Sequence, residues 1–206
     1  MHTLESDLAL QDPKRMSTPT TARPAFGTVL ADQMAIAKFS HGRWSEHEIR
    51  PTGPIEVHPA AHVLHYASEC FEGFKAYRWA DGSIHVFRMD KHIERMRQSA
   101  RLLVLPEPDA KQLATMVLTV IDRVRGQVPE PPGALYLRPT MLGTDVTIGS
   151  AASPSRAAIL FVLACPVGDY LPPGRLTVAV ETQTPRTTPQ FGVVKTGANY
   201  AMALTP

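Results

Sequence analysis

The sequence of residues 109–126 is DAKQLATMVLTVIDRVRG, and its apolar side chains recur every three or four positions. This spacing is typical of a helix that packs one face on a core. Asp109 is a favourable N-cap residue, Gln112 follows three positions later, and Gly126 can close the helix. The stretch therefore predicts an amphipathic helix with an apolar face formed by Leu113, Met116, Val117, Val120, Ile121 and Val124.

Strands are predicted on both sides of this helix. Residues 134–141 are rich in β-forming side chains, and residues 157–165 are apolar throughout, which is typical of a strand buried on both faces. Earlier in the chain, the patterns predict strands at 28–39 and 84–87 and a second helix at 90–102. This mixture of helices and strands indicates an α/β (α+β) fold.

The predicted elements divide the chain into four parts. Residues 1–25 carry prolines among Ser, Thr and Arg and are expected to form a flexible arm. Residues 26–168 are expected to form a small α/β domain, and residues 169–175 an interdomain linker. Residues 176–206 would begin a second, larger domain, with a half-buried strand predicted at 176–180 from alternating apolar side chains.

Composition argues against several classes of function. The 206 residues carry 21 Lys and Arg against 19 Asp and Glu, a formal net charge of +2, so no basic excess indicates a nucleic-acid partner. No apolar run reaches the length of a membrane span. The two cysteines form neither a CxxC motif nor a disulfide framework, so the expected location is a reducing cytoplasm.

Three histidines raise the alternative of a zinc protein. On a helix, His58, His62 and His65 would share one face, as zinc ligands require, but Pro59 lies within the run. The other interpretation is a polar turn before a buried segment. We therefore expect no metal site.

Other residue groups can bind anions or carbonyl compounds. Arg95 borders the apolar stripe of the basic helix at 90–102, where it can contact a buried anion or simply face solvent. Tyr136 and Arg138 are two apart on a predicted strand, so they share a face that either holds a carboxylate or is merely solvated. Lys195 follows two valines and is either a Schiff-base lysine or an exposed turn residue.

Four motifs in order resemble one family. They are HYASECFEGFKAYR at 65–78, LYLRP at 135–139, PVGDY at 166–170 and KTGANY at 195–200. Together they are similar to the branched-chain amino-acid aminotransferases, which are class IV, fold-type IV enzymes with pyridoxal 5'-phosphate as cofactor. The resemblance implies transfer of the amino group of L-leucine, L-isoleucine or L-valine to 2-oxoglutarate, by a homodimer when the chain is full length.

The resemblance also implies a role for each matching residue. Lys195 matches the lysine that holds the cofactor through a Schiff base and moves the proton at the substrate Cα. Arg95 matches the arginine at the cofactor phosphate, and Tyr200 the tyrosine near its phenolic oxygen. Further residues match the lining of the substrate pocket: Tyr66, Phe71, Gly73, Tyr136, Arg138 and Tyr170.

The sequence departs from the family pattern at three points, one of which is that it lacks the redox CxxC motif of some animal homologues. Ala198 stands where the family usually has a glycine, which is strained if the position needs a positive φ. The family's chain also continues well beyond Tyr200, so we expect a chain truncated at its C-terminus and weak or inactive by itself.

Two alternatives to this function stay open. The first is another class IV enzyme, such as a D-amino-acid or amine aminotransferase or an aminodeoxychorismate-type lyase. The second is a truncated, non-catalytic remnant, which would bind no cofactor at Lys195.

Overall fold

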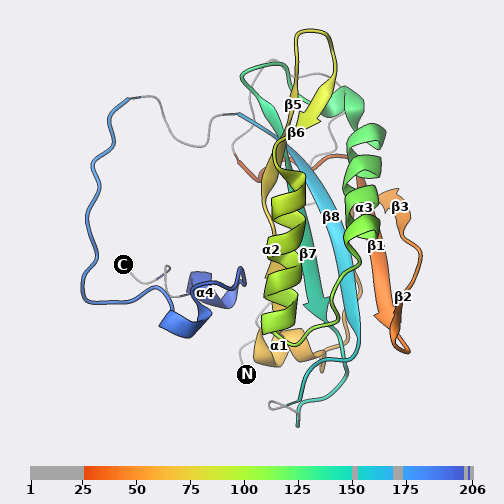
Figure 1. Ribbon diagram of the computed structural model, residues 1–206, viewed down its shortest axis with the longest axis vertical. Helices are drawn as coiled ribbons and strands as arrows, with labels where there is room; N and C mark the ends of the chain where they lie inside the picture. The colour runs from red at the N-terminus through yellow and green to blue at the C-terminus, as the bar shows by residue number, and fades with distance from the viewer. Residues whose placement is uncertain (1–25, 150–152, 169–173, 202–203, 205–206) are drawn as a thin grey trace, which may run out of the picture.

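The structure is a computed structural model and describes residues 26–149, 153–168, 174–201 and 204. Its frame is an eight-stranded sheet with the order β2-β1-β8-β7-β5-β6, in which β3 also pairs with β1 and β4 with β7 (Figure 1). The strands are β1 (Gln33–Ser40), β2 (Arg43–Trp44), β3 (Glu48–Pro51), β4 (Glu69–Phe71), β5 (Phe74–Arg78), β6 (Ile84–Val86), β7 (Ala134–Gly143) and β8 (Ala158–Val167). The α-helices are α1 (His62–Tyr66), α2 (Met89–Leu102), α3 (Ala110–Arg123) and α4 (Ala198–Ala201), with 3-10 turns at Arg125–Gln127 and Pro189–Phe191.

The centre of the sheet is the antiparallel pairing of β7 with β8 over ten residue pairs. Along β7, buried residues alternate with half-buried ones. Leu137 and Met141 belong to the hydrophobic core, so Tyr136 and Arg138 leave the opposite face of the sheet. The face shared by this pair, expected from its spacing, is confirmed. The strand predicted at 157–165 is confirmed as β8, which is buried over most of its length.

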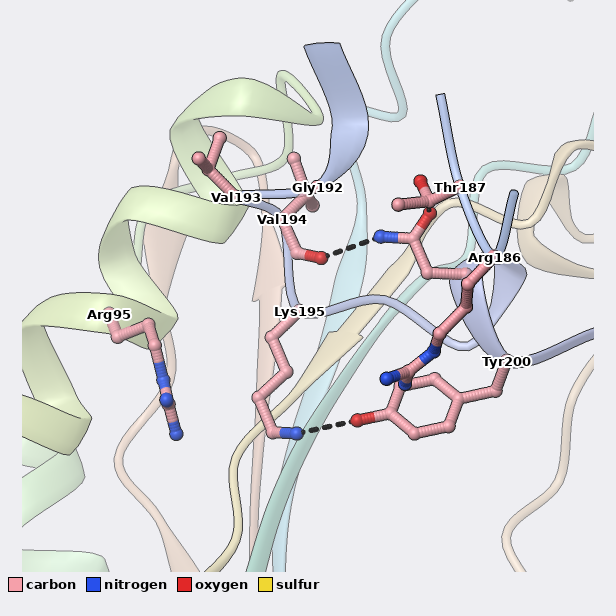
Figure 2. Close-up of a pocket in the computed structure, with 9 residues that line it drawn as sticks. Arg95, Arg186, Thr187, Gly192, Val193, Val194, Lys195 and Tyr200 are labelled. Carbon is pink, nitrogen blue, oxygen red and sulfur yellow. Dashed lines mark hydrogen bonds between the residues drawn. The ribbon is translucent and has the colours of Figure 1, made fainter. Parts of the chain in front are cut away.

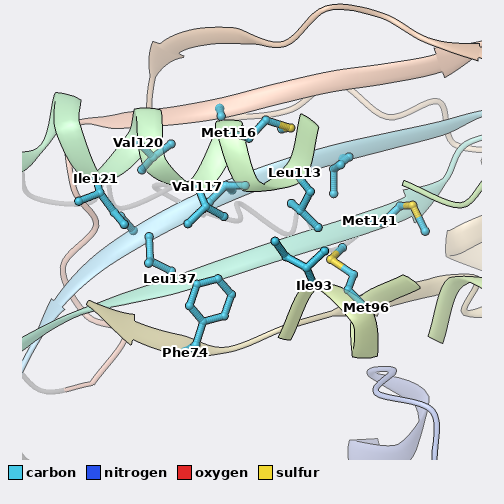
Figure 3. Packing of buried hydrophobic residues seen from close by; sticks show 14 of the residues in the cluster. Phe74, Ile93, Met96, Leu113, Met116, Val117, Val120, Ile121, Leu137 and Met141 are labelled. Atoms are coloured by element: carbon cyan, nitrogen blue, oxygen red, sulfur yellow. The ribbon is translucent and has the colours of Figure 1, made fainter. Parts of the chain in front are cut away.

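The two long helices cover one face of the sheet. Figure 1 shows α2 and α3 side by side in front of β7 and β8. The Asp109 carboxylate accepts a hydrogen bond from the Gln112 backbone N–H at 2.7 Å, so the predicted N-cap is confirmed. The core between helices and sheet is shown in Figure 3, and its labelled residues are Phe74, Ile93, Met96, Leu113, Met116, Val117, Val120, Ile121, Leu137 and Met141.

Sequence periodicity did not reveal α1, β4 or β5. These elements have only five, three and five residues, too few for a periodic pattern to stand out. On β4, Cys70 is fully buried in the core. The neighbouring side chains of Glu69 and Phe71 therefore leave the other face of the sheet, the face that carries Tyr136 and Arg138.

The strand predicted at 176–180 is wrong. This stretch is irregular, and the side chains of Val178 and Val180 are 80% and 84% exposed. An alternating pattern shows which side chains could share a face, but a strand also needs a hydrogen-bonded neighbour. No described strand pairs with residues 176–180. The expected arm at 1–25 and residues 169–173 of the expected linker lie outside the described residues.

The mixture of helices and antiparallel strands confirms the expected α/β (α+β) class. Among the helices of the described ranges, none combines the length and the apolar character that crossing a membrane requires.

Replacing Leu137 by alanine tests the assignment of the core. Because this side chain is fully buried, Leu137→Ala should lower the free energy of unfolding by about 2–5 kcal/mol. Urea denaturation followed by circular dichroism measures the change. Leu118→Ala is the matched control, since Leu118 lies on the exposed side of α3 and its loss should have little effect. An equal loss of unfolding free energy in the two variants would contradict the assignment of Leu137 to the core.

Candidate active site

A cluster of aromatic and cationic side chains lies on the sheet face opposite the helices. The Arg138 guanidinium donates to the Tyr136 hydroxyl from Nε at 3.1 Å and from NH2 at 2.9 Å. Its central carbon lies 4.5 Å from the centre of the Phe71 ring. Gly73 faces the same tyrosine, and a side chain there would collide with the Tyr136 hydroxyl. Tyr136 and Arg138 thus form a compact donor pair beside an apolar ring.

The segment that carries Lys195 is fixed to this face through its backbone. The Lys195 N–H donates to Ser99 Oγ on α2 at 3.0 Å, and the Lys195 carbonyl accepts from the Phe71 N–H on β4 at 3.1 Å. The neighbours Val194 and Thr196 are both buried. The lysine backbone is therefore held between a helix and a strand that are about a hundred residues earlier in the chain.

The Lys195 side chain extends from this anchored backbone into a pocket. Its ammonium donates to the Tyr200 hydroxyl at 2.8 Å and lies 4.6 Å from the centre of the Phe71 ring. Figure 2 shows the pocket, which is lined by Arg95, Arg186, Thr187, Gly192, Val193, Val194, Lys195, Asn199 and Tyr200. The sequence-predicted residues Lys195, Arg95 and Tyr200 are thus brought together.

Cations surround the Tyr200 phenol. The hydrogen bond from Lys195 is the largest cause that lowers the pKa of Tyr200, burial opposes it in part, and the nearby Arg186 guanidinium adds a smaller lowering effect. The guanidinium carbon of Arg186 lies 4.4 Å from the centre of the Tyr200 ring. Sequence reasoning missed Arg186, because nothing in its local pattern indicates that it folds back onto a residue fourteen positions later.

Two acidic residues of the motif at 65–78 also contact the site. Glu69 Oε1 accepts from the Gly197 N–H and, at 3.3 Å, from the Thr196 hydroxyl. Burial raises the pKa of Glu69, and these hydrogen bonds oppose part of the shift. Glu72 is buried and binds the Arg95 guanidinium. Sequence reasoning missed both, because their partners are distant in the chain and only the fold makes them neighbours.

The residue after Gly197 does not carry the strain that was considered for it. Ala198 begins α4 and is not among the described residues with a positive φ. The turn is closed by the Asn199 N–H on the Thr196 carbonyl at 3.2 Å and the Tyr200 N–H on the Gly197 carbonyl at 2.8 Å. An alanine is compatible with this helical turn, so the departure from the family pattern costs no strain at this position.

Of the sequence-predicted pocket residues, one has its contacts away from the lysine and one lies outside the described residues. Tyr66 lies at the end of α1, where its hydroxyl donates to the Ile148 carbonyl and its ring packs on His62. None of these contacts involves the segment of Lys195. Tyr170 lies outside the described residues.

The three histidines considered as zinc ligands do not converge. His58 Nδ1 accepts from the Ala60 N–H at 3.0 Å, and His62 Nδ1 shares a hydrogen bond of 2.8 Å with Ser68 Oγ. His65 Nε2 lies 2.9 Å from the Pro59 carbonyl oxygen. Within the described ranges, no group of three or more His, Cys, Asp or Glu side chains is placed to hold a metal ion, so these histidines do not form the cluster considered for zinc.

Gly197→Ala tests the contact between Glu69 and the lysine segment. An added Cβ would collide with Glu69 Oε1, which can only move away by giving up its hydrogen bonds to residues 196 and 197. We therefore expect faster amide hydrogen exchange over residues 195–200, measured by mass spectrometry. Gly53→Ala is the matched control, since nothing lies within 4 Å of its added Cβ. Unchanged exchange in Gly197→Ala would contradict the contact.

Lys195→Met tests the electrostatic coupling to Tyr200. The ammonium of Lys195 stabilises the phenolate, so its removal should raise the pKa of Tyr200 toward the ordinary range of a tyrosine. Ultraviolet absorbance of the phenolate during a pH titration measures this change, and Tyr200→Phe identifies which part of the signal belongs to Tyr200. A Tyr200 titration that is identical with and without Lys195 would refute the coupling.

Solved structures share this fold. The crystal structure of the branched-chain aminotransferase from the thermophilic archaeon Thermoproteus uzoniensis with norvaline superposes with a TM-score of 0.66 and 24% identity, covering 84% of this chain and 54% of that one. The branched-chain amino acid aminotransferase from Thermobaculum terrenum in its PLP-form gives a TM-score of 0.63 at 18% identity, with coverage of 84% and 53%. The fold-type IV architecture expected from the resemblance is confirmed.

Curated relatives are more similar in sequence. The cytosolic branched-chain-amino-acid aminotransferase of Saccharomyces cerevisiae is 39% identical over 186 residues, which are 88% of this chain and 49% of the relative. The branched-chain-amino-acid aminotransferase of Mycobacterium tuberculosis (strain CDC 1551 / Oshkosh) is 42% identical over 189 residues, 88% of this chain and 50% of the relative. The chain thus spans about half the length of these relatives.

The sequence pattern of one family covers most of the site. The family described as Amino-transferase class IV matches residues 69–205, a range that begins at Glu69 on β4 and includes Arg95, Lys195 and Tyr200. Because this match extends over more than half of the 206 residues, the chain belongs to the class IV aminotransferases.

Proposed function

We propose that the protein is a branched-chain amino-acid aminotransferase that uses pyridoxal 5'-phosphate to move the amino group of L-leucine, L-isoleucine or L-valine to 2-oxoglutarate. The observation that carries the proposal is Lys195. Its backbone is bound on both sides, to Ser99 and Phe71, while its amine extends into a pocket with Arg95 and Tyr200. The relatives in yeast and Mycobacterium tuberculosis bear the name of this activity.

The donor groups of the pocket suit this cofactor. An amine is required to bond the aldehyde, and guanidinium groups bind phosphate well. Lys195, Arg95 and Arg186 supply these groups within one pocket, and the Tyr200 phenol is within hydrogen-bonding distance of the amine. When bound there, pyridoxal phosphate supplies the electron sink for the carbanion formed at the substrate Cα.

Lys195 is the catalytic residue of the proposed reaction. Its amine would hold the aldehyde carbon of the cofactor and, when free, would move the proton between the substrate Cα and C4′ of the cofactor. Such a transfer needs an amine with a fixed position. The backbone hydrogen bonds of Lys195 and the contact of its Nζ with Tyr200 supply that position.

The face of the sheet beside the lysine supplies groups for the substrate. Arg138 and the Tyr136 hydroxyl can bind a carboxylate by charge-assisted hydrogen bonds. Phe71 offers an apolar surface for a branched side chain, and Gly73 leaves room for Tyr136. Tyr66 and Tyr170 stay predicted members of the same pocket.

The organisation of the whole protein is part of the proposal. We infer a small domain at 26–168, a linker at 169–175 and the beginning of the larger cofactor-binding domain at 176–206. The proposed assembly is a homodimer and the proposed location is the cytoplasm. The division is supported by the sheet, because every strand among the described residues lies between Gln33 and Val167.

Reduction with borohydride tests the cofactor and its lysine together. After incubation with pyridoxal 5'-phosphate, borohydride should leave a stable pyridoxyl group on Lys195, which peptide mass spectrometry locates. Lys195→Ala should abolish this label, because it removes the reacting amine. Lys91→Ala, which removes an exposed lysine of α2, should not. A label at another residue would refute the assignment of Lys195, and no label at all would favour a non-catalytic remnant.

The substrate is tested by amino transfer to 2-oxoglutarate with the cofactor present. The proposal requires turnover of L-leucine, detected as glutamate. Turnover of D-alanine without L-leucine would instead identify another class IV enzyme.

A further inference from the structure

The buried carboxylate of Glu72 is unusual for its position beside the pocket. Its side chain is 1% exposed, and an isolated charge so deeply buried would be very unfavourable. Donors surround it: Arg95 through Nε and, at 2.7 Å, through NH2; His92 Nδ1 at 2.9 Å; and the Gly73 N–H at 3.2 Å. The carboxylate is therefore compensated, and the Arg95 guanidinium is its main partner.

The arginine differs from its carboxylate partner in exposure. The Arg95 side chain is 47% exposed and lines the pocket together with Lys195 and Tyr200. Without a partner, a long side chain at this position would sample many rotamers. Glu72 uses the edge of the guanidinium formed by Nε and NH2, so the edge formed by NH1 and NH2 is turned away from Glu72. Figure 2 shows the Arg95 guanidinium projecting from α2 on the same side as the Lys195 amine.

The same short segment orders both cationic groups of the pocket. Phe71 binds the Lys195 carbonyl through its backbone, and the next residue, Glu72, binds Arg95 through its side chain. The Glu72 N–H itself donates to the Pro139 carbonyl at 2.8 Å, so this segment is tied to β7. The spacing between the amine and the guanidinium is thus set by one rigid piece of the sheet.

We propose that Glu72 is a positioning residue that orients Arg95 to bind the phosphate of the cofactor. This inference rests on the proposed function. Glu72 does not strengthen the attraction of the site for an anion, since its negative charge offsets that of Arg95. Its contribution is to pre-organise the guanidinium, so that a bound phosphate does not have to order a half-exposed side chain.

A comparison of two cofactors tests the proposal. Pyridoxal 5'-phosphate carries the phosphate, and pyridoxal has the same aldehyde without it. The apparent affinity of each is measured as the concentration that gives half-maximal borohydride labelling of Lys195. Glu72→Gln keeps the shape of the side chain but weakens the pair of hydrogen bonds that the carboxylate accepts from Arg95. Because the Arg95 side chain regains rotamer freedom, the affinity for pyridoxal phosphate should fall about tenfold. The affinity for pyridoxal should stay unchanged.

Glu94→Gln is the matched control. Glu94 also lies on α2 and pairs with two arginines, Arg97 and Arg101, but outside the pocket. Its substitution should change neither affinity. Equal losses for the two cofactors in Glu72→Gln would mean a purely structural role, and unchanged or tighter binding of pyridoxal phosphate would also overturn the proposal.

A second variant covers the case in which Glu72→Gln does not fold. Arg95→Lys changes a half-exposed side chain and keeps the positive charge, but a lysine cannot present two parallel N–H groups to Glu72. It should again weaken pyridoxal phosphate selectively, and an unchanged ratio of the two affinities would overturn the proposal. If the unsubstituted protein takes no label at Lys195 from either cofactor, the proposed function itself has failed.

Discussion

The pairing of β7 with β8 is the constraint on which the rest of the molecule depends. Its ten residue pairs fix the register of the central strands, and register decides which side chains of β7 reach the core. A shift by one residue would exchange Leu137 with Tyr136 or Arg138. The same hydrogen bonds that build the hydrophobic core therefore also present a hydroxyl and a guanidinium on the opposite face.

The lysine segment uses this frame through a few polar contacts. Ser99 on α2, Glu69 and Phe71 on β4 all bind the backbone or side chains of residues 195–197. Because the backbone is held on both sides, the flexible part of Lys195 is reduced to its side chain. The backbone of Lys195 is thereby fixed relative to the sheet, although the residue itself lies in an irregular segment.

Sequence alone predicted the long elements and failed where partners decide the structure. The helices at 90–102 and 109–126 have enough residues to show a 3.6-residue period, and both exist, although the second ends at Arg123 and Gly126 lies in the 3-10 turn that follows. The three-residue strand β4 has no such pattern. The alternation at 176–180 was misleading, because periodicity cannot reveal whether a neighbouring strand exists.

The site was predictable to the extent that it follows motifs. Lys195 and Tyr200 lie in one motif, Arg95 follows from the resemblance at the basic helix, and all three line one pocket. The sequence pattern assigns Glu72 no partner, since Arg95 is 23 residues away and their contact depends on how α2 lies against β4. Such contacts are properties of the packed fold and leave no local signal.

The exposed stretch at 174–185, which ends before the pocket residue Arg186, has a consequence for how the protein can vary. The lysine is positioned by contacts to β4 and α2, so the connecting chain only has to span the gap. Doubling the length of such a loop costs roughly 0.6 kcal/mol of closure entropy. Natural insertions and deletions should therefore accumulate in this connection among related proteins, while the spacing from Lys195 to Tyr200 should stay constant.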